Sequence, residues 1–235
     1  TAEDAVGPGA DLSALIKDPM LPTLVLIPTV LERDMLAPAL RAVVGAGRVE
    51  LCGFGPVAAA ARTAQLLAEY APAQVLLVGI AGRLDDRLTV GSAYRFERVA
   101  CHGVGVGSGP GFRSAEQLGW QQWPGDAAGE PIGDLLACGP QRGPTAAQAG
   151  LLLTACAAAA NPDDVRLRKQ LYPDAMAEDM EGFAVALACR LRGVPLDIVR
   201  GISNSAGDRD KAAWQTPIAL EAAAQLSLRL LTEAL

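Results

Sequence analysis

The stretch that decides the fold runs from residue 23 to residue 82 and reads TLVLIPTVLERDMLAPALRAVVGAGRVELCGFGPVAAAARTAQLLAEYAPAQVLLVGIAG. Three short apolar runs, at 23–29, 48–55 and 73–82, are typical of buried strands. Helical spacing separates them at 30–44 and 56–70, and the second of these helices has a proline in its first turn. Strands that alternate with helices in this way predict a sheet that is covered on both faces.

The rest of the chain continues the alternation. Further strands are predicted at 90–100, 150–161 and 195–203, and further helices at 177–193 and 214–235. A glycine-dense, irregular section lies between 101 and about 128, and such a section is usually a functional loop or a subunit contact. The expected fold is α/β, a three-layer αβα sandwich around a twisted, mostly parallel central sheet.

No linker or internal repeat divides the sequence, so a single domain is expected over residues 23–235. Residues 1–22 are rich in Ala, Gly, Pro and Asp and are expected to form a flexible N-terminal extension. They lack the basic region followed by an apolar core that marks a secretory signal.

Composition excludes several classes of protein. The 235 residues carry a net charge of −6, which argues against a nucleic-acid partner. No stretch is apolar and long enough for a membrane span. The five cysteines are odd in number and scattered without a CxxC, so we expect reduced, buried thiols in a cytoplasmic protein. The only histidine, His102, has no ligand cluster around it, so no metal site is expected and His102 is read as structural or surface.

Glycines follow two of the predicted strands. The segment GFGPVA, from Gly53 to Ala58, fits the G-x-G-x-x-A dinucleotide fingerprint, but the next strand ends without an acidic residue to hold a ribose. NAD is therefore not expected, which leaves close approach of another ligand to Gly55 or simple tight packing. In VGIAGRL, Gly79 and Gly82 either make a tight turn or let a flat ring lie against the backbone.

Each of two glutamates, Glu181 and Glu32, has both a structural and a functional interpretation. Glu181 follows Asp179 at the start of an apolar predicted helix, where a carboxylate either caps the helix or accepts hydrogen bonds from ligand hydroxyls. Glu32 follows the first strand and is either a solvated first-turn residue or part of a site. No Ser-His-Asp or Cys-His set is available for acyl transfer.

The C-terminal half carries the most specific pattern. The stretch from 178 to 210 resembles the nucleoside phosphorylase/nucleosidase superfamily, which has an acidic-Met-Glu motif followed about twenty residues later by a strand ending Arg-x-Ile-Ser-Asp or Asn. The corresponding residues are Asp179, Met180, Glu181, Arg200, Ile202, Ser203 and Asn204. The resemblance covers about 24–231. Within the superfamily the segments IPTVLERDML, GPGFRSAEQLGW and ISNSAGDRDKAAW are most similar to the futalosine hydrolases.

That resemblance implies hydrolysis of an N-ribosidic bond through an oxocarbenium-like transition state, without metal or nicotinamide. Glu181 would hold the ribose 2′- and 3′-hydroxyls, and Glu32 would orient and deprotonate the attacking water. Asn204, steadied by Ser203, would stabilise charge on the departing purine. Arg200 would brace the loop.

The resemblance also implies a substrate site completed by neighbouring segments. Gly55, Gly79, Gly82 and Met180 would line it, and Phe112 would cover it, either in its own subunit or in a neighbouring one. The family's stacking aromatic is replaced by ACAAAANP here, so Phe183 or Trp214 would flank the base. The expected partners are a small purine nucleoside and further copies of the chain, as a homodimer or a larger homo-oligomer.

Asn204 suggests which purine is read. The related methylthioadenosine/S-adenosylhomocysteine nucleosidases carry an aspartate at this position, and a carboxylate suits the 6-amino donor of adenine. A 6-oxopurine presents an acceptor at O6 beside N7, so an amide can donate to O6 and accept from protonated N7. Asn204 therefore predicts hypoxanthine as the leaving base and futalosine as the substrate.

Other functions stay open from the sequence. A phosphorylase on the same fold would use phosphate in place of water, with Arg83 and Arg113 as candidate anion ligands. A purine-nucleoside binding protein without catalysis would bind and not turn over. A dinucleotide-dependent oxidoreductase comes last.

Overall fold

The computed structural model describes residues 23–44, 48–126, 129–139 and 147–233; the expected extension at 1–22 lies outside them. In chain order the elements are β1 (Thr23–Ile27), α1 (Val30–Arg41), β2 (Arg48–Leu51), α2 (Pro56–Tyr70), β3 (Gln74–Arg83), β4 (Ala93–His102), β5 (Gly105–Val106), the 3-10 turn η2 (Gly109–Gly111), β6 (Arg113–Ser114), the 3-10 turn η3 (Glu116–Leu118), β7 (Leu135–Ala137), β8 (Gln148–Ala155), α3 (Pro162–Leu171), β9 (Ala175–Asp179), α4 (Gly182–Leu191), β10 (Leu196–Ser205) and α5 (Thr216–Glu233).

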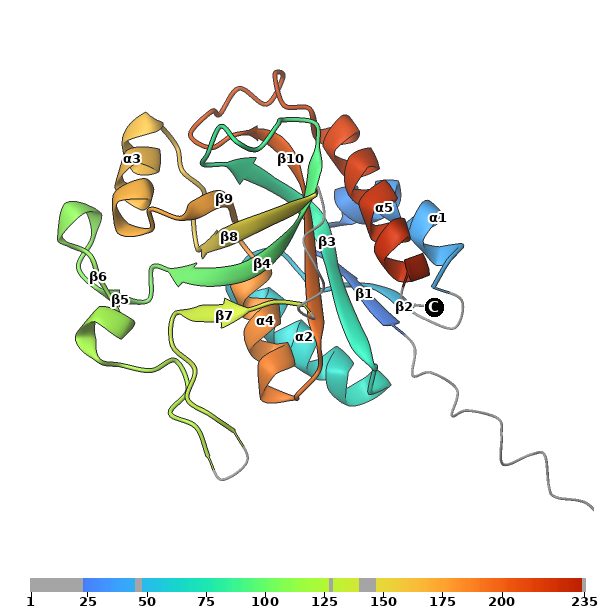
Figure 1. Ribbon diagram of the computed structural model, residues 1–235, viewed down its shortest axis with the longest axis horizontal. Coiled ribbons are helices and arrows are strands. Elements are labelled where there is room, and N and C mark those ends of the chain that lie inside the picture. Colours follow the sequence, from blue (N-terminus) through green and yellow to red (C-terminus); the bar gives the residue numbers. More distant parts are fainter. Residues whose placement is uncertain (1–22, 45–47, 127–128, 140–146, 234–235) are drawn as a thin grey trace, which may run out of the picture.

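The main sheet is mixed and closes on itself. β3 pairs with β10, β10 with β4, β4 with β8, β8 with β9, and β9 returns to β3, while β1 and β2 extend the sheet from β3 (Figure 1). The pairs β10–β4, β3–β9 and β4–β7 are antiparallel. The α/β class is as predicted. The parallel pairs outnumber the antiparallel ones, but the sheet is mixed and closed, so it differs from the open three-layer sandwich that was expected.

The length of β3 explains the closure. Its first residues pair with β1, its last two pair with β9, and β10 runs along the other edge for nearly the whole strand. A twisted strand of ten residues changes direction along its length, so its two ends can serve different neighbours. Short apolar runs in the sequence do not contain that information.

Helices cover the sheet in two pairs. α1 and α5 lie side by side and bury Leu36, Leu40 and Leu220 against one face (Figure 1). α2 and α4 pack together on another face around Leu66 and Val185. The expectation of helices on both faces is therefore confirmed.

Two elements differ from the sequence prediction near 160–180. The helix expected from 177 starts at Gly182, because 175–179 is strand β9. Helix α3 was not predicted, although its signal was present: Asn161 accepts hydrogen bonds from the backbone N–H groups of Asp163 and Asp164, and proline occupies the first turn. α1 runs unbroken through Pro38.

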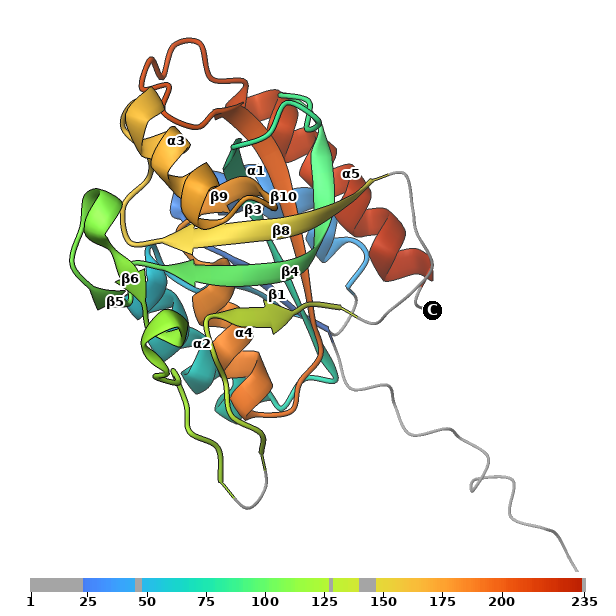
Figure 2. The ribbon, with the colours of Figure 1, turned by 60° about the vertical axis from the view of Figure 1, so that its left-hand side comes forward.

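The glycine-dense section folds into a small sheet of β5 and β6, which Figures 1 and 2 both place near α3 and away from α5. His102 lies edge-on between the rings of Phe112 and Tyr172, consistent with a structural role.

All five cysteines are free thiols; Cys101 is half-buried and Cys156 is exposed, so the burial of the thiols was overpredicted. Among the described residues, no helix combines the length and apolarity needed to cross a membrane.

Candidate active site

A cavity of about 330 Å³ opens where the parallel strands β1, β3 and β10 end. Carboxyl ends of parallel strands are where α/β proteins bind ligands. The residues that line it come from these strand ends, the start of α1, the segments after β2, β8 and β9, and the loop before α5: Pro28, Thr29, Leu31, Glu32, Phe54, Ile80, Ala81, Gly82, Ala158, Ala159, Glu178, Asp179, Met180, Glu181, Ser203, Asn204, Gly207, Arg209, Lys211 and Trp214.

Glu32 is a buried member of this site. Thr29 caps α1, and its hydroxyl donates to Oε2 of Glu32 at 2.5 Å. The backbone N–H of Ile80, at the end of β3, donates to Oε1 at 2.9 Å. The residue is only 4% exposed, so the solvated first-turn reading is excluded. The carboxylate is held by donors on two sides at the edge of the cavity.

Glu181 lines the same cavity from the N-terminal end of α4. Its Oε1 accepts the backbone N–H of Gly55 at 2.9 Å, and its Oε2 lies 3.6 Å from Nη2 of Arg200. Burial raises the pKa of Glu181 to about 7, while the Arg200 guanidinium acts to lower it. Gly55 thus positions the carboxylate through its backbone, and it is not among the residues that line the cavity.

Arg200 forms a buried hub behind the cavity. Its Nη2 and Nε donate to Oδ2 of Asp179 at 2.7 and 3.0 Å, and Oδ1 of Asp179 accepts the Thr154 hydroxyl at 2.6 Å. The side chain is fully buried, and its Nη1 has no hydrogen-bond partner among the described residues. Buried donors rarely stay unpaired, so Nη1 marks a place for a ligand atom or a water.

Gly79 shows where Nη1 points. A Cβ on Gly79 would collide with Nη1 of Arg200 and would lie 2.7 Å from Oε1 of Glu32. The guanidinium and the carboxylate therefore approach the same small volume without forming an ion pair. The sequence left Gly79 open between a tight turn and contact with a flat ring; in the structure neither Gly79 nor Arg200 lines the cavity, and Gly79 leaves room for Arg200, which holds Asp179 from behind.

Ser203 and Asn204 are aimed at the cavity by a bulge. The register of β10 against β3 shifts between Ile202 and Asn204, and a bulge of this kind redirects side chains. Oδ1 of Asn204 accepts the Ser203 hydroxyl at 2.8 Å, and Nδ2 donates to the carbonyl of Ser205 at 2.8 Å. One amide N–H and one lone pair of the amide oxygen are left for a ligand.

The aromatic residues are placed differently from the prediction. Trp214 and Phe54 line the cavity, whereas Phe183 is 3% exposed within the core and does not. Phe54 was missed by sequence reasoning, although its position between two glycines directly after a strand was a usable signal. Gly82 and Met180 line the cavity as expected.

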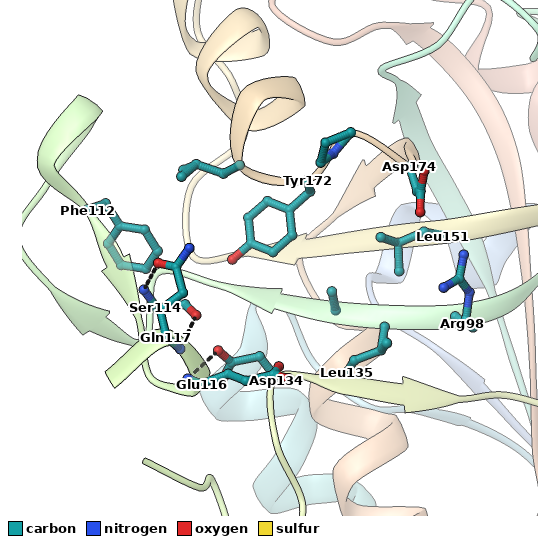
Figure 3. Close-up of a pocket in the computed structure, with 13 residues that line it drawn as sticks. Arg98, Phe112, Ser114, Glu116, Gln117, Asp134, Leu135, Leu151, Tyr172 and Asp174 are labelled. Atoms are coloured by element: carbon teal, nitrogen blue, oxygen red, sulfur yellow. Dashed lines mark hydrogen bonds between the residues drawn. The ribbon is translucent and has the colours of Figure 1, made fainter. Parts of the chain in front are cut away.

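Phe112 lines a second cavity of about 390 Å³, shown in Figure 3, with Ser114, Glu116, Asp134 and Tyr172 among its neighbours. Several polar groups there hold local loops, because Asp134 accepts the backbone N–H of Glu116 at 2.9 Å and a glutamine side chain at 3.0 Å. The structure therefore does not bring Phe112 to the Glu181 cavity of its own chain. Its covering of a neighbouring subunit's site stays a prediction.

Comparison with known proteins places the chain. The sequence model of the "Phosphorylase superfamily" matches residues 43–235. The chain belongs to this superfamily. A futalosine hydrolase of Streptomyces coelicolor is 33% identical over 175 residues, which cover 72% of this chain and 72% of that protein. A 5′-methylthioadenosine/S-adenosylhomocysteine nucleosidase of Tolumonas auensis is 31% identical, over 69% and 70% of the two chains.

Solved structures of the superfamily share the fold. The Neisseria meningitidis 5′-methylthioadenosine/S-adenosylhomocysteine nucleosidase, in complex with methylthio-immucillin-A, superposes with a TM-score of 0.72 and 20% identity, covering 92% of this chain and 100% of that one. The Streptococcus pyogenes S-adenosylhomocysteine nucleosidase gives a TM-score of 0.71 at 22% identity, covering 91% and 97%. The resemblance read from the sequence motifs is thereby confirmed at the level of the superfamily and its fold.

Proposed function

We propose that this chain hydrolyses the N-ribosidic bond of futalosine and releases hypoxanthine and dehypoxanthinyl futalosine, a step of the alternative menaquinone pathway in the cytoplasm. The observation that carries the proposal is the amide of Asn204, which keeps one free donor and one free acceptor in the cavity that also holds Glu32 and Glu181. The similarity to a futalosine hydrolase supports it.

Glu181 is suited to hold the ribose. Its backbone donor Gly55 and the nearby Arg200 occupy only part of its acceptor capacity, since an ionised carboxylate offers about four lone-pair sites. The 2′- and 3′-hydroxyls of the sugar donate to the remaining sites. A buried carboxylate without such donors would be costly, which explains its raised pKa in the free protein.

Glu32 and Arg200 together are suited to hold the nucleophile. Oε1 of Glu32 and the unpaired Nη1 of Arg200 both lie beside Gly79, where we place the attacking water between them. The water donates to Glu32 and accepts from Arg200. As its oxygen bonds to C1′ and the bond from C1′ to N9 breaks, Glu32 takes the proton, a general-base role.

Asn204 receives the leaving base. As N9 keeps the electron pair of the broken bond, a solvent water in the cavity gives a proton to N7. The free N–H of Asn204 donates to O6 of hypoxanthine and its oxygen accepts from the N7–H, so the departing purine is stabilised. The Ser203 hydroxyl and the Ser205 carbonyl fix which end of the amide is which. Trp214 or Phe54 supplies the aromatic face that the loop at Ala158 and Ala159 lacks.

Hydrolysis is favoured over phosphorolysis by the charge at the nucleophile position. Glu32 is buried and lies beside the proposed water. A phosphate dianion at that position would be strongly repelled by the carboxylate, because the two charges would be close together in a region of low dielectric constant. The guanidinium beside Gly79, that of Arg200, already faces the carboxylates of Asp179 and Glu181, and the cations Arg209 and Lys211 lie on the loop before α5.

We also propose that the protein works as a homodimer or a larger homo-oligomer. Leu31 and Phe54 line the cavity and yet are 64% and 65% exposed, which is unusual for large apolar side chains at a ligand site. A second subunit would cover them. Sedimentation equilibrium on the wild type and on Phe54→Ser tests this, because a monomeric wild type contradicts it.

The test of the reaction is base release from futalosine, aminofutalosine, inosine and methylthioadenosine, followed by chromatography with and without phosphate. Hypoxanthine released from futalosine at a rate indifferent to phosphate is the expected result. Strict dependence on phosphate would identify a phosphorylase, and binding without turnover would identify a non-catalytic nucleoside-binding protein. Glu32→Gln serves as the inactive reference for background hydrolysis.

A further inference from the structure

The cavity is divided by charge into two ends. Its inner end holds the carboxylates of Glu32, Asp179 and Glu181, together with Glu178, which is paired with the buried Arg168. The residues of its outer end include Arg209 and Lys211, both exposed at the rim. A ligand that fits both ends is rich in hydroxyl donors at one end and anionic at the other.

In the loop before α5, the basic side chains face the cavity and the acidic side chains do not line it. The sequence from 208 to 211 alternates Asp, Arg, Asp, Lys, and only the two basic residues line the cavity. The two acidic side chains accept backbone N–H groups of their own loop: Asp208 accepts Asp210, and Asp210 accepts Ala212, at 2.9 and 3.1 Å. Within the described part of the chain, neither Arg209 nor Lys211 has an ion-pair partner.

Trp214 packs against Arg209 at the outer end of the cavity. The guanidinium of Arg209 lies 5.6 Å from the centre of the Trp214 ring, and the indole N–H donates to the carbonyl of Asp208 at 3.2 Å. Stacking on an aromatic face limits the orientations of a guanidinium and leaves its edge free for a bidentate anion. Arg209 is therefore partly pre-organised before any ligand arrives.

We infer that Arg209 and Lys211, supported by Trp214, form a subsite for an oxyanion on the 5′ side of the nucleoside. The inference rests on the proposed function, because Glu181 and Asn204 fix where the ribose and the base lie. With these two groups at the inner end, the 5′ substituent is the part of the substrate left to extend toward the rim. A carboxylate at its far end meets the two cations, whereas a neutral 5′ group leaves them unused.

The experiment compares kcat/KM for futalosine, its carboxylate methyl ester, inosine and inosine 5′-monophosphate. The enzymes are wild type, Arg209→Gln, Lys211→Gln, the double variant and the control Arg192→Gln, which removes an exposed cation at the end of α4. Each substitution is expected to lower kcat/KM for futalosine roughly tenfold, mainly through KM, and to affect inosine and the ester far less. If the rim substitutions also lower kcat/KM for inosine 5′-monophosphate, the subsite accepts any oxyanion on the 5′ side. If they lower it only for futalosine, the subsite requires the longer arm that carries the carboxylate.

Equal losses on futalosine and inosine, or no loss in the double variant, would overturn the inference. Binding of futalosine and of its ester to Glu32→Gln by titration calorimetry, with and without the rim substitutions, gives a readout that needs no turnover. Failure of the proposed hydrolysis therefore shows as an inactive wild type, whereas failure of the subsite shows as equal affinities for futalosine and its ester.

Discussion

Asn204→Asp is the sharpest perturbation of the proposed base recognition. It changes the side chain by one group and keeps the oxygen that accepts the Ser203 hydroxyl. The amide nitrogen, which donates to the carbonyl oxygen of Ser205 at 2.8 Å, is replaced by a carboxylate oxygen, so two acceptors then face each other. The bond to Ser205 is lost, and so is the donor that faces O6 of the base.

The magnitude follows from the contacts. Leaving a buried polar group unpaired costs about 1–3 kcal/mol, which corresponds to a loss of roughly 5- to 150-fold in kcat/KM for a 6-oxopurine nucleoside. A 6-aminopurine nucleoside gains an acceptor for its amino group, so its turnover moves in the opposite direction. The preference for 6-oxo over 6-amino substrates should therefore fall by roughly two orders of magnitude or more.

The assay is kcat/KM for two pairs that differ only at position 6, futalosine with aminofutalosine and inosine with adenosine. Asn161→Asp is the matched control, because Asn161 is the other asparagine of the chain and acts as an acceptor at the start of α3, a role that a carboxylate also fills. An unchanged preference in Asn204→Asp, with both substrates slowed equally, would refute the amide as the reader of the base.

Three further predictions concern the inner end of the cavity. Glu32→Gln should lower kcat by roughly 10²- to 10⁴-fold with little change in KM, and a change confined to KM would contradict the general-base role. Gly79→Ala should displace Arg200 and Glu32 and lower kcat/KM at least tenfold, whereas Gly111→Ala, with open space at its Cβ, should be silent. Because burial raises the pKa of Glu181 to about 7, kcat/KM should rise as the pH passes through 7 and the carboxylate ionises. Because Glu181 has a higher pKa in the folded protein than in the unfolded chain, the protonated side chain stabilises the fold at low pH, and this stabilisation is lost as the pH rises from about 4.5 to about 7. The Tm of the wild type should therefore fall over this pH range, and the Tm of Glu181→Gln should fall less.

The sequence predicted the elements whose signal is local. The run from 56 to 70 was predicted as a helix with those bounds, because proline at its start, alanine-rich periodicity and the lack of a breaker all act within one segment. The end of β10 and the start of α4 were assigned as ligand positions through the resemblance of their motifs to the nucleoside phosphorylase/nucleosidase superfamily. Glu32, Glu181, Ser203 and Asn204 do lie around one cavity.

What the sequence could not supply depends on pairing between distant segments. The closure of the sheet requires β9 to reach the end of β3, and five residues at 175–179 give no sign of that partner. The same pairing places Asp179 at the end of a strand, where its Oδ2 accepts the backbone N–H of Gly182 at the start of α4, as the sequence suggested, and also binds Arg200, which the sequence did not suggest. The role of Gly79 could not be read either, because the guanidinium that needs its space comes from another strand, 121 positions further along the chain, at Arg200.

The buried charges at the inner end suggest why this arrangement favours the proposed chemistry. Glu32, Asp179 and Glu181 surround a single guanidinium, that of Arg200, so the inner end carries excess negative charge when all three are ionised. Such an excess is costly in the free protein: burial raises the pKa of Glu181, and the neighbouring carboxylates of Asp179 and Glu32 raise it further. A sugar that develops positive charge at C1′ would relieve it, and the relief is greatest in the transition state, where that charge is greatest. The same carboxylates would repel an anionic substituent, so a substrate with a carboxylate must bind with that group at the cationic rim.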